Sequence, residues 1–504
     1  MTRRLPDHPS LEHLKKQAKV VLDQLTAGDP VAHERFRALL DRTAPPAPQL
    51  ADAQLLLARD YGFASWAKLK AHVESIAADP PAELVAAIHA NDANRVRDVL
   101  ERYPELATRL NDTMPGLHFG ATPLLAAVPC ANREMIDALL EAGADINQKS
   151  HWWAGGFGVL DDDRGLAPFL IERGARVDVH AAARLGRMDD LERLVAADPE
   201  LVHARGGDGQ TALHVAPNVA VAQWLLDHGA RIDERDVDHE STPAQYMVRD
   251  RQEVARFLVS RGCHTDLLMA AALGDLPLAR RHLDADPGCI RMYVADEWFP
   301  KRDPRSGGCV YIWTLGQLAT PHSVAREFGH DEVLQFLMDR SPEELKLALA
   351  CDLGDEATLR QLLAARPRLA DSLSEGDKKH LVRAAQHNNA NAVRLLLAAG
   401  WPVVVRGGDG GTPLHWAAWH GNTAMVREIL RYDPPLDLRG DDHDLPALGW
   451  ALHGSEHGWH RQTGDYPGVV DALLAAGAQL PEKEFEVSEA IRAVLKRYGE
   501  RRKR

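Results

Sequence analysis

Apolar residues recur every three or four positions through the first eighty residues, and this spacing predicts amphipathic helices. The apolar positions of the first predicted helix are Leu11, Leu14, Ala18, Val21, Leu22 and Leu25. Capping residues and a helix-stopping glycine punctuate the pattern at Ser10, Asp29, Gly62 and Ser65. They predict further helices from Pro30, over 51–60 and over 66–76, and a short linker at 78–81. We therefore expect a small helical module over residues 1–80.

Beyond this module one pattern repeats with a period near 33 residues, through about twelve units between residues 82 and 480, several of them degenerate. Each unit has a helix rich in small residues, a turn, a second helix rich in Leu and Val, and an exit at Gly or Pro. Thr followed by Pro opens the first helix at Thr122, Thr242, Thr320 and Thr412. The hydroxyl suits a helix cap, and proline lacks only an N–H that has no partner in the first turn. One unit cannot bury its apolar face alone, so stacking must supply the core.

Two segments resemble the ankyrin repeat closely: G-D-G-Q-T-A-L-H-V-A at 207–216 and G-D-G-G-T-P-L-H-W-A-A-W-H-G-N at 408–422. The resemblance implies an all-α solenoid of stacked helix-turn-helix units with short hairpin-like fingers. It also implies that His214 and His415 bond to loop backbone and brace neighbouring repeats. The sequence departs from the family pattern at His322, where Leu is usual, and over residues 150–180, which lack a clear first helix.

The front module resembles a helical segment that precedes ankyrin arrays in bacterial proteins, through L-K-K-Q-A-K at 14–19 and Y-G-F-A-S-W at 61–66. The resemblance implies a bacterial ankyrin-repeat protein. At the other end, residues 481–504 predict a C-terminal capping helix and a basic tail that includes Arg492, Lys496 and Arg497.

The composition of the chain limits the expected partners and the expected location of the protein. The 504-residue chain has a formal net charge of −14, which argues against nucleic-acid binding over a large surface and leaves the basic tail as the weakest functional hypothesis. No stretch approaches the roughly 20 apolar residues of a membrane span, and residues 1–25 contain no secretory apolar core. The five cysteines show no paired spacing. We therefore expect a cytoplasmic protein without membrane contact.

Three long irregular segments interrupt the repeat and carry the candidate binding residues. They are the first insertion (151–163), the second insertion (297–313) and the third insertion (452–467). The candidate contact residues are His151, Trp152, Trp153, Trp298, Arg302, Tyr311, Trp313, His457 and Trp459. Loop aromatics suit recognition of a partner, and they equally suit pinning of an insertion onto the solenoid.

Three histidines of the third insertion, His453, His457 and His460, have a spacing that allows a zinc site, although Gly454 and Gly458 argue against a rigid helix there. Phosphate-binding, metalloprotease, serine-hydrolase and paired-cysteine motifs are missing. We therefore expect a protein–protein interaction scaffold without a cofactor, which holds its partner on the concave face. The alternative is a ligand-binding or catalytic solenoid, in which the insertions form one pocket for a small molecule, with or without a metal.

Overall fold

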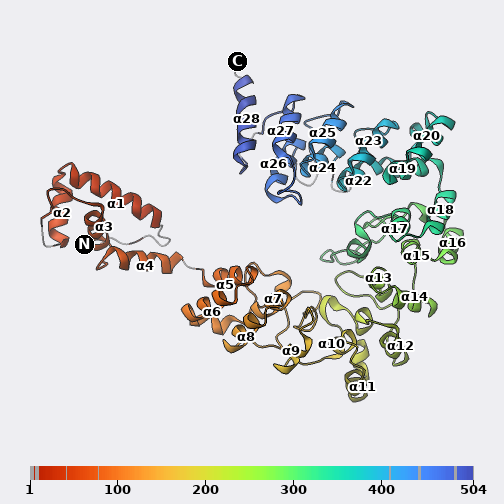
Figure 1. Cartoon of the computed structure of the whole chain (residues 1–504), viewed down its shortest axis with the longest axis horizontal. Helices are drawn as coiled ribbons and strands as arrows, with labels where there is room; N and C mark the ends of the chain where they lie inside the picture. Colours follow the sequence, from red (N-terminus) through yellow and green to blue (C-terminus); the bar gives the residue numbers. More distant parts are fainter. Residues whose placement is uncertain are drawn as a thin grey trace. The chain divides into compact units, whose positions relative to one another are not determined.

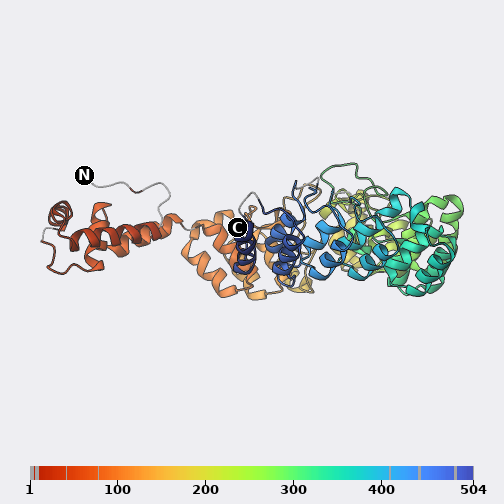
Figure 2. The same cartoon turned by 90° about the horizontal axis from the view of Figure 1, so that it is seen from above.

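The computed structural model describes residues 5, 11–40, 43–77, 79–407, 410–440, 444–481 and 485–502. Within these ranges the protein consists of helices joined by turns and loops, without a strand, as Figures 1 and 2 show. The chain divides into two compact units, residues 1–212 and residues 213–504, and each is described by itself. The prediction of an all-helical fold is confirmed.

Four helices open the first unit: α1 (Leu11–Thr26), α2 (Pro30–Leu40), α3 (Leu50–Asp60) and α4 (Trp66–Ala77). Two predicted caps are confirmed, because Asp29 Oδ1 accepts from Val31 N at 2.8 Å and Ser65 Oγ accepts from Lys68 N at 3.3 Å. Gly62 follows α3 with a φ of 84°, as a helix-stopping glycine does. Ser10 lies outside the described residues.

The remaining helices of the first unit come mostly in pairs. These are α5 (Pro80–His89) with α6 (Ala93–Arg102), α7 (Pro123–Ala127) with α8 (Arg133–Glu141), and α10 (Val179–Arg184) with α11 (Met188–Ala197). Only α9 (Ala167–Glu172) lies between α8 and α10, in agreement with the missing first helix near residues 150–180. α5 contacts α6 in its own pair and α7 in the next, so neighbouring pairs share one core.

The second unit continues the pairing. A 3-10 turn (Ala212–Val215) takes the place of a first helix before α12 (Val219–Asp227). The pairs that follow are α13 (Pro243–Met247) with α14 (Gln252–Ser260), α15 (Leu267–Leu273) with α16 (Leu276–Ala285), α17 (Pro321–Glu327) with α18 (Asp331–Arg340), α19 (Glu343–Leu353) with α20 (Glu356–Ala365), α22 (His380–Gln386) with α23 (Ala390–Ala398), α24 (Pro413–Trp419) with α25 (Thr423–Leu430), and α26 (Ala447–His457) with α27 (Tyr466–Ala475). The short α21 (Glu375–Lys378) precedes α22.

Threonine and small residues shape these pairs as the sequence predicts. Thr242, Thr320 and Thr412 each form a capping box with proline in the first turn. Ala417 and Ala418 are completely buried on α24, which contacts both α22 and α26. A methyl side chain leaves room for neighbouring helices to approach closely, so the stack packs densely at its first helices.

The two family histidines differ in what they bond. His214 Nε2 lies 3.1 Å from the carbonyl oxygen of Ser241, which confirms the predicted bond to loop backbone. His415 Nδ1 accepts from Thr412 N at 3.2 Å and lies 2.7 Å from Thr412 Oγ1, within its own repeat, and the ring also interacts with the backbone of Leu438 and Leu445 in the loop before α26. The ring of His415 therefore strengthens the cap of α24.

The structure corrects the sequence prediction for the third insertion. Residues 447–457 form α26, so His453 and His457 lie on a helix that passes through Gly454. An added Cβ at Gly454 would lie 2.6 Å from the carbonyl oxygen of Trp419, on the neighbouring α24. Glycine is present here because two helices approach closely, and its helix-breaking tendency is overridden by that packing.

The last helix, α28 (Glu489–Arg502), packs against α27. Ser488 Oγ accepts from Ile491 N at 3.4 Å at its start, and the Ile491 side chain is buried in the core of the second unit. Arg497 pairs with Asp471 on α27, and Tyr498 Oη donates to Asp471 Oδ1 at 2.9 Å. Across the described ranges, no helix combines the length and the apolar character needed to cross a lipid bilayer.

Candidate functional site

The first insertion, in the first unit, packs on the turn before α7. The Trp152 ring lies 5.0 Å from that of Phe119, edge to face, and 6.3 Å from that of Trp153. Both tryptophans are half-buried, and the backbone N–H of His151 donates to Gly120 O at 2.9 Å. These contacts support the interpretation that Trp152 and Trp153 hold the insertion onto the repeat.

The second insertion, in the second unit, is part of a loop between α16 and α17 that is closed at its base. Val294 N donates to Ala319 O at 3.0 Å, and Leu318 N donates to Val294 O at 2.9 Å. These two bonds bring the ends of the loop together, so that its ordering is independent of any partner.

Tyr311 anchors this loop from within. Its side chain is completely buried, and Tyr311 Oη donates to Asp266 Oδ2 at 2.9 Å. Asp266 also caps α15 by accepting from Met269 N at 2.8 Å. Burial raises the pKa of both the Asp266 carboxyl and the Tyr311 phenol. Tyr311 therefore holds the insertion in place, and it offers no surface for the partner contact that the sequence predicted.

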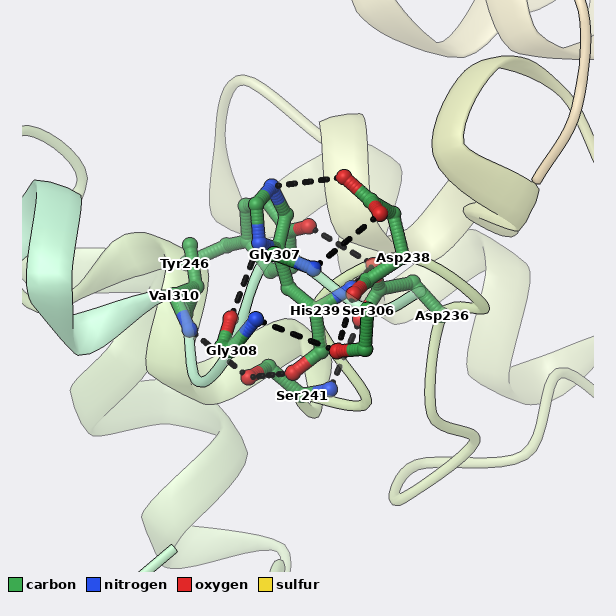
Figure 3. A network of polar contacts seen from close by, with 9 residues as sticks. All are labelled: Asp236, Asp238, His239, Ser241, Tyr246, Ser306, Gly307, Gly308 and Val310. Carbon is green, nitrogen blue, oxygen red and sulfur yellow. Dashed lines mark hydrogen bonds and ion pairs between the residues drawn. The ribbon is translucent and has the colours of Figure 1, made fainter. Parts of the chain in front are cut away.

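A network of polar contacts joins the insertion to the loop 236–241 that precedes α13 (Figure 3). Gly307 N donates to Asp238 O at 3.0 Å, and Ser306 Oγ donates to the same oxygen at 2.5 Å. His239 Nδ1 lies 2.9 Å from Gly308 O, and Val310 N donates to Ser241 Oγ at 3.0 Å. Three backbone positions of the insertion and the Ser306 side chain are thus held by one loop.

Asp236 organises that loop in turn. Its carboxylate accepts from Ser241 N and from His239 N, both at 2.7 Å, and from Tyr246 Oη at 3.0 Å (Figure 3). Burial raises the pKa of Asp236, while the two backbone donors oppose that shift. The residues D-V-D-H-E-S at 236–241 carried a polar signal in the sequence, but nothing there linked them to residues about 70 positions later.

Trp313 is the most exposed of the tryptophans predicted as contact residues. It lies on a π-helical turn (Ile312–Gly316), and its side chain is 71% exposed. Trp298 is half-buried and Arg302 is exposed on the same insertion. A large indole in water on an anchored loop is the kind of group that dominates protein interfaces.

The third insertion presents Trp459, 64% exposed, on a cluster of aromatic rings. The Trp459 ring stacks on Trp416 with centroids 6.0 Å apart and planes 20° apart. His453 and His457 on α26 have ring centroids 4.5 Å apart, whereas His460 lies against His420 at 5.1 Å. Among the described residues, His453, His457 and His460 do not bring three ligand atoms within 4.8 Å of one another, so this geometry offers no preformed zinc site.

Phe119 is a surface aromatic that the sequence reasoning missed. It is 55% exposed and has a φ of 56°, which is unusual for an aromatic residue. A backbone strained in this way is a signal that only coordinates reveal.

The cysteines give no support to nucleophilic chemistry. All five are free, and burial raises the pKa of Cys309 to about 11 and of Cys289 to about 11. Thiols with raised pKa values are poor nucleophiles near neutral pH.

Comparison with known proteins identifies the repeats. The family model described as "Ankyrin repeats (3 copies)" matches residues 179–269 and 347–442, and that described as "Ankyrin repeat" matches residues 119–151. No curated protein matches the chain in sequence.

Two solved structures illustrate the likeness. The human ASB11 ankyrin repeat domain is 19% identical, with 60% of this chain and 99% of that chain covered and a TM-score of 0.24. A chain from the Bd0816 predatory endopeptidase of Bdellovibrio bacteriovorus in complex with immunity protein Bd3460 is 21% identical, with 36% and 97% covered and a TM-score of 0.23. At these values neither likeness indicates what this chain binds. The family models and the stacked helix pairs together show that the chain is an all-helical ankyrin-repeat protein, in which N-terminal helices precede the repeats.

Proposed function

We propose that this protein is a scaffold that binds a protein partner, and that the Trp313 indole is a principal contact. Ankyrin repeats typically bind proteins. The observation that carries the proposal is the contrast within the second insertion, where Tyr311 is completely buried and Trp313, two residues later, is 71% exposed. The loop is therefore ordered before binding, so little conformational entropy is lost when Trp313 meets a partner.

Trp459 is the second proposed contact. Its ring rests on Trp416, so it is held in one orientation although 64% exposed. His457, two residues earlier in the sequence and exposed, completes the proposed surface at this end of α26. Rigid aromatic groups of this kind give contact area at low entropic cost.

The alternative, a ligand-binding or catalytic solenoid, needs the insertions to converge. Within the second unit, the second and third insertions are separated by the stacked helices α19 to α25. This separation favours a scaffold with several contact points over a single shared pocket.

A nucleic-acid-binding tail has less support. Arg497 pairs with Asp471, and Lys496 Nζ lies 4.0 Å from Glu500 Oε1. These pairs suit a solvated helix end that needs no nucleic acid to neutralise it. Lys503 and Arg504 lie outside the described residues. A bacterial and cytoplasmic setting stays part of the proposal, motivated by the front module and by the unpaired cysteines.

Site-specific photo-crosslinking tests the scaffold. A photoreactive phenylalanine at position 313 is expected to capture one defined protein from the source cell. Trp313→Ala should weaken binding of that protein at least about tenfold, as truncation of a central aromatic contact does. Its unfolding temperature should not change, because the indole packs on little of the protein.

The matched control is Tyr432→Ala, at an exposed aromatic residue after α25. This variant should bind the captured protein normally. If Trp313→Ala and Trp459→Ala both keep full affinity for it, the proposed contact surface is wrong. If no protein is captured with the photoreactive residue at position 313 or at position 459, the scaffold proposal itself fails.

A further inference from the structure

A pocket of about 180 Å³ opens between the loop that precedes α13 and the second insertion. Its walls come from Arg235, His239, Glu240, Trp298, Phe299, Pro300, Lys301, Arg302, Ser306, Gly308 and Cys309. Three of these side chains carry a permanent positive charge and one carries a negative charge. The pocket is therefore electropositive in a chain whose net charge is −14.

The negatively charged side chain of the pocket, Glu240, already accepts hydrogen bonds from the insertion. The Glu240 carboxylate accepts from Arg302 N at 2.9 Å and from Asp303 N at 2.7 Å. Both donors are backbone N–H groups, so Glu240 shapes the loop and leaves the nearby cationic side chains without a carboxylate from this residue. Arg235 bonds the Glu240 backbone, with Nη1 donating to the carbonyl oxygen at 2.6 Å.

The cations of the insertion are weakly compensated. Lys301 Nζ lies 3.6 Å from Asp296 Oδ2, at the exposed rim. The Arg302 guanidinium has no carboxylate partner within the described part of the chain. A planar guanidinium beside an ammonium group is the donor set that recognises carboxylate and phosphate oxygens.

Trp298 adds a further donor and an apolar face. Its indole Nε1 is shielded from solvent and has no hydrogen-bond acceptor among the described residues. Leaving such a donor buried without an acceptor is unfavourable. An acceptor group that entered the pocket would find an indole wall and two cationic side chains.

The walls are rigid because the network of Figure 3 holds them. His239 bonds Gly308, and Ser306 bonds Asp238, so the two sides of the pocket are tied together by side chain–backbone contacts. Gly308 has a φ of 82°, and an added Cβ would lie 3.1 Å from Ile312 Cδ1 and 3.3 Å from Lys301 Cε. The pocket is thus a formed feature of the insertion.

We propose that this pocket binds an oxyanion group, a carboxylate or a phosphate, through Arg302 and Lys301 beside the Trp298 indole. The group is supplied by an acidic side chain of a protein partner or by a small free anion. The proposal stands apart from the role of Trp313, because neither source needs the Trp313 indole for recognition.

The test uses the full chain labelled with ¹⁵N-tryptophan. The chain has eleven tryptophans, so its indole N–H signals form a short list, and Trp298→Phe identifies the signal of Trp298. The probes are inorganic phosphate, glutamate and a hexaglutamate peptide, each titrated at low ionic strength. A saturable shift of the Trp298 signal is expected, and added salt should weaken it because exposed charges are screened.

Arg302→Gln should reduce the affinity about tenfold, since a charge-assisted hydrogen bond is lost. The matched control is Arg256→Gln, which removes the same charge from the exposed face of α14 and lines no wall of the pocket. A response to phosphate and glutamate points to a small anion, and a response to hexaglutamate alone points to an acidic partner segment. The absence of any saturable shift, or a shift that Arg302→Gln leaves unchanged, overturns the proposal whatever the outcome for Trp313.

Discussion

The second and third insertions look alike in the sequence and differ in the structure. Both are rich in aromatics and both interrupt the repeat. The second insertion stays irregular, and backbone–side-chain hydrogen bonds to residues 236–241 hold it (Figure 3). The first part of the third insertion, residues 452–457, belongs to helix α26, which packs closely against α24. The comparison teaches that an insertion with its own polar partner can remain a loop, whereas one with a continuous apolar neighbour is drawn into the stack.

Among the predicted changes, Gly454→Ala should have the largest effect. It disturbs the packed region, which consists of α24 and α26. The new Cβ would lie 2.6 Å from Trp419 O, a backbone atom that cannot move without shifting α24. We expect a loss of about 3 kcal/mol in the free energy of unfolding, measured by urea titration, as overpacking of a tight contact causes. The control is Gly499→Ala in α28, where the nearest atom is Leu480 Cδ1 at 3.9 Å and stability should hold or rise. Equal stability of both variants would show that α24 and α26 are not closely packed.

Acid should separate the two regions. Burial lowers the pKa of His415 to about 4 and also lowers the pKa of His420, both in the packed region. An unfolded histidine titrates near 6.5, so between that pH and the folded pKa the unfolded chain binds the proton first. As the pH falls through this window, each such histidine lowers the free energy of unfolding by about 1.4 kcal/mol per pH unit.

The two buried carboxyl groups that hold the second insertion should respond in the opposite direction. Burial raises the pKa of Asp236 and Asp266, so both carboxyl groups take up a proton at a higher pH in the folded state than in the unfolded state. Acidification therefore removes the cost of burying their charge. Hydrogen exchange should be measured at pH 7 and at pH 5 and corrected for intrinsic rates. Acidification should reduce the protection of α24 and α26 more than that of residues 297–313. His415→Gln should flatten the pH dependence of α24, and an unchanged slope would contradict the assignment to this residue.

Tyr311→Phe should loosen the second insertion alone. Asp266 would lose the hydrogen bond from Tyr311 Oη inside the protein, which costs about 1–2 kcal/mol. Hydrogen exchange should become faster over residues 297–313 while α26 stays protected. Tyr432→Phe, which removes a hydroxyl from an exposed ring, should leave both regions unchanged. Protection that persists in Tyr311→Phe would mean that residues 236–241 hold the loop without this anchor.

Thr412→Val gives the smallest expected effect on the packed region. The hydroxyl caps α24, and its loss should cost about 1 kcal/mol in urea unfolding. Thr412→Ser keeps the hydroxyl and should retain most of the stability. If Thr412→Val keeps full stability while Thr412→Ser loses it, the threonine methyl group, and not the cap, makes the contribution.

The sequence by itself determined the helices, their caps and the repeat. Asp29, Ser65 and the Thr-Pro pairs start helices where predicted, because a cap depends on residues within one turn. The periodic apolar positions likewise decide that the helices stack, since each must cover its apolar face.

Only the tertiary structure decided the functional surfaces. Three features depend on residues far apart in the chain. They are the burial of Tyr311 near exposed Trp313, the helix through Gly454, and the pocket in which Glu240 bonds the backbone of Arg302. Local pattern cannot supply these contacts, because it cannot say which loop bonds to which, or where two helices come too close for a side chain.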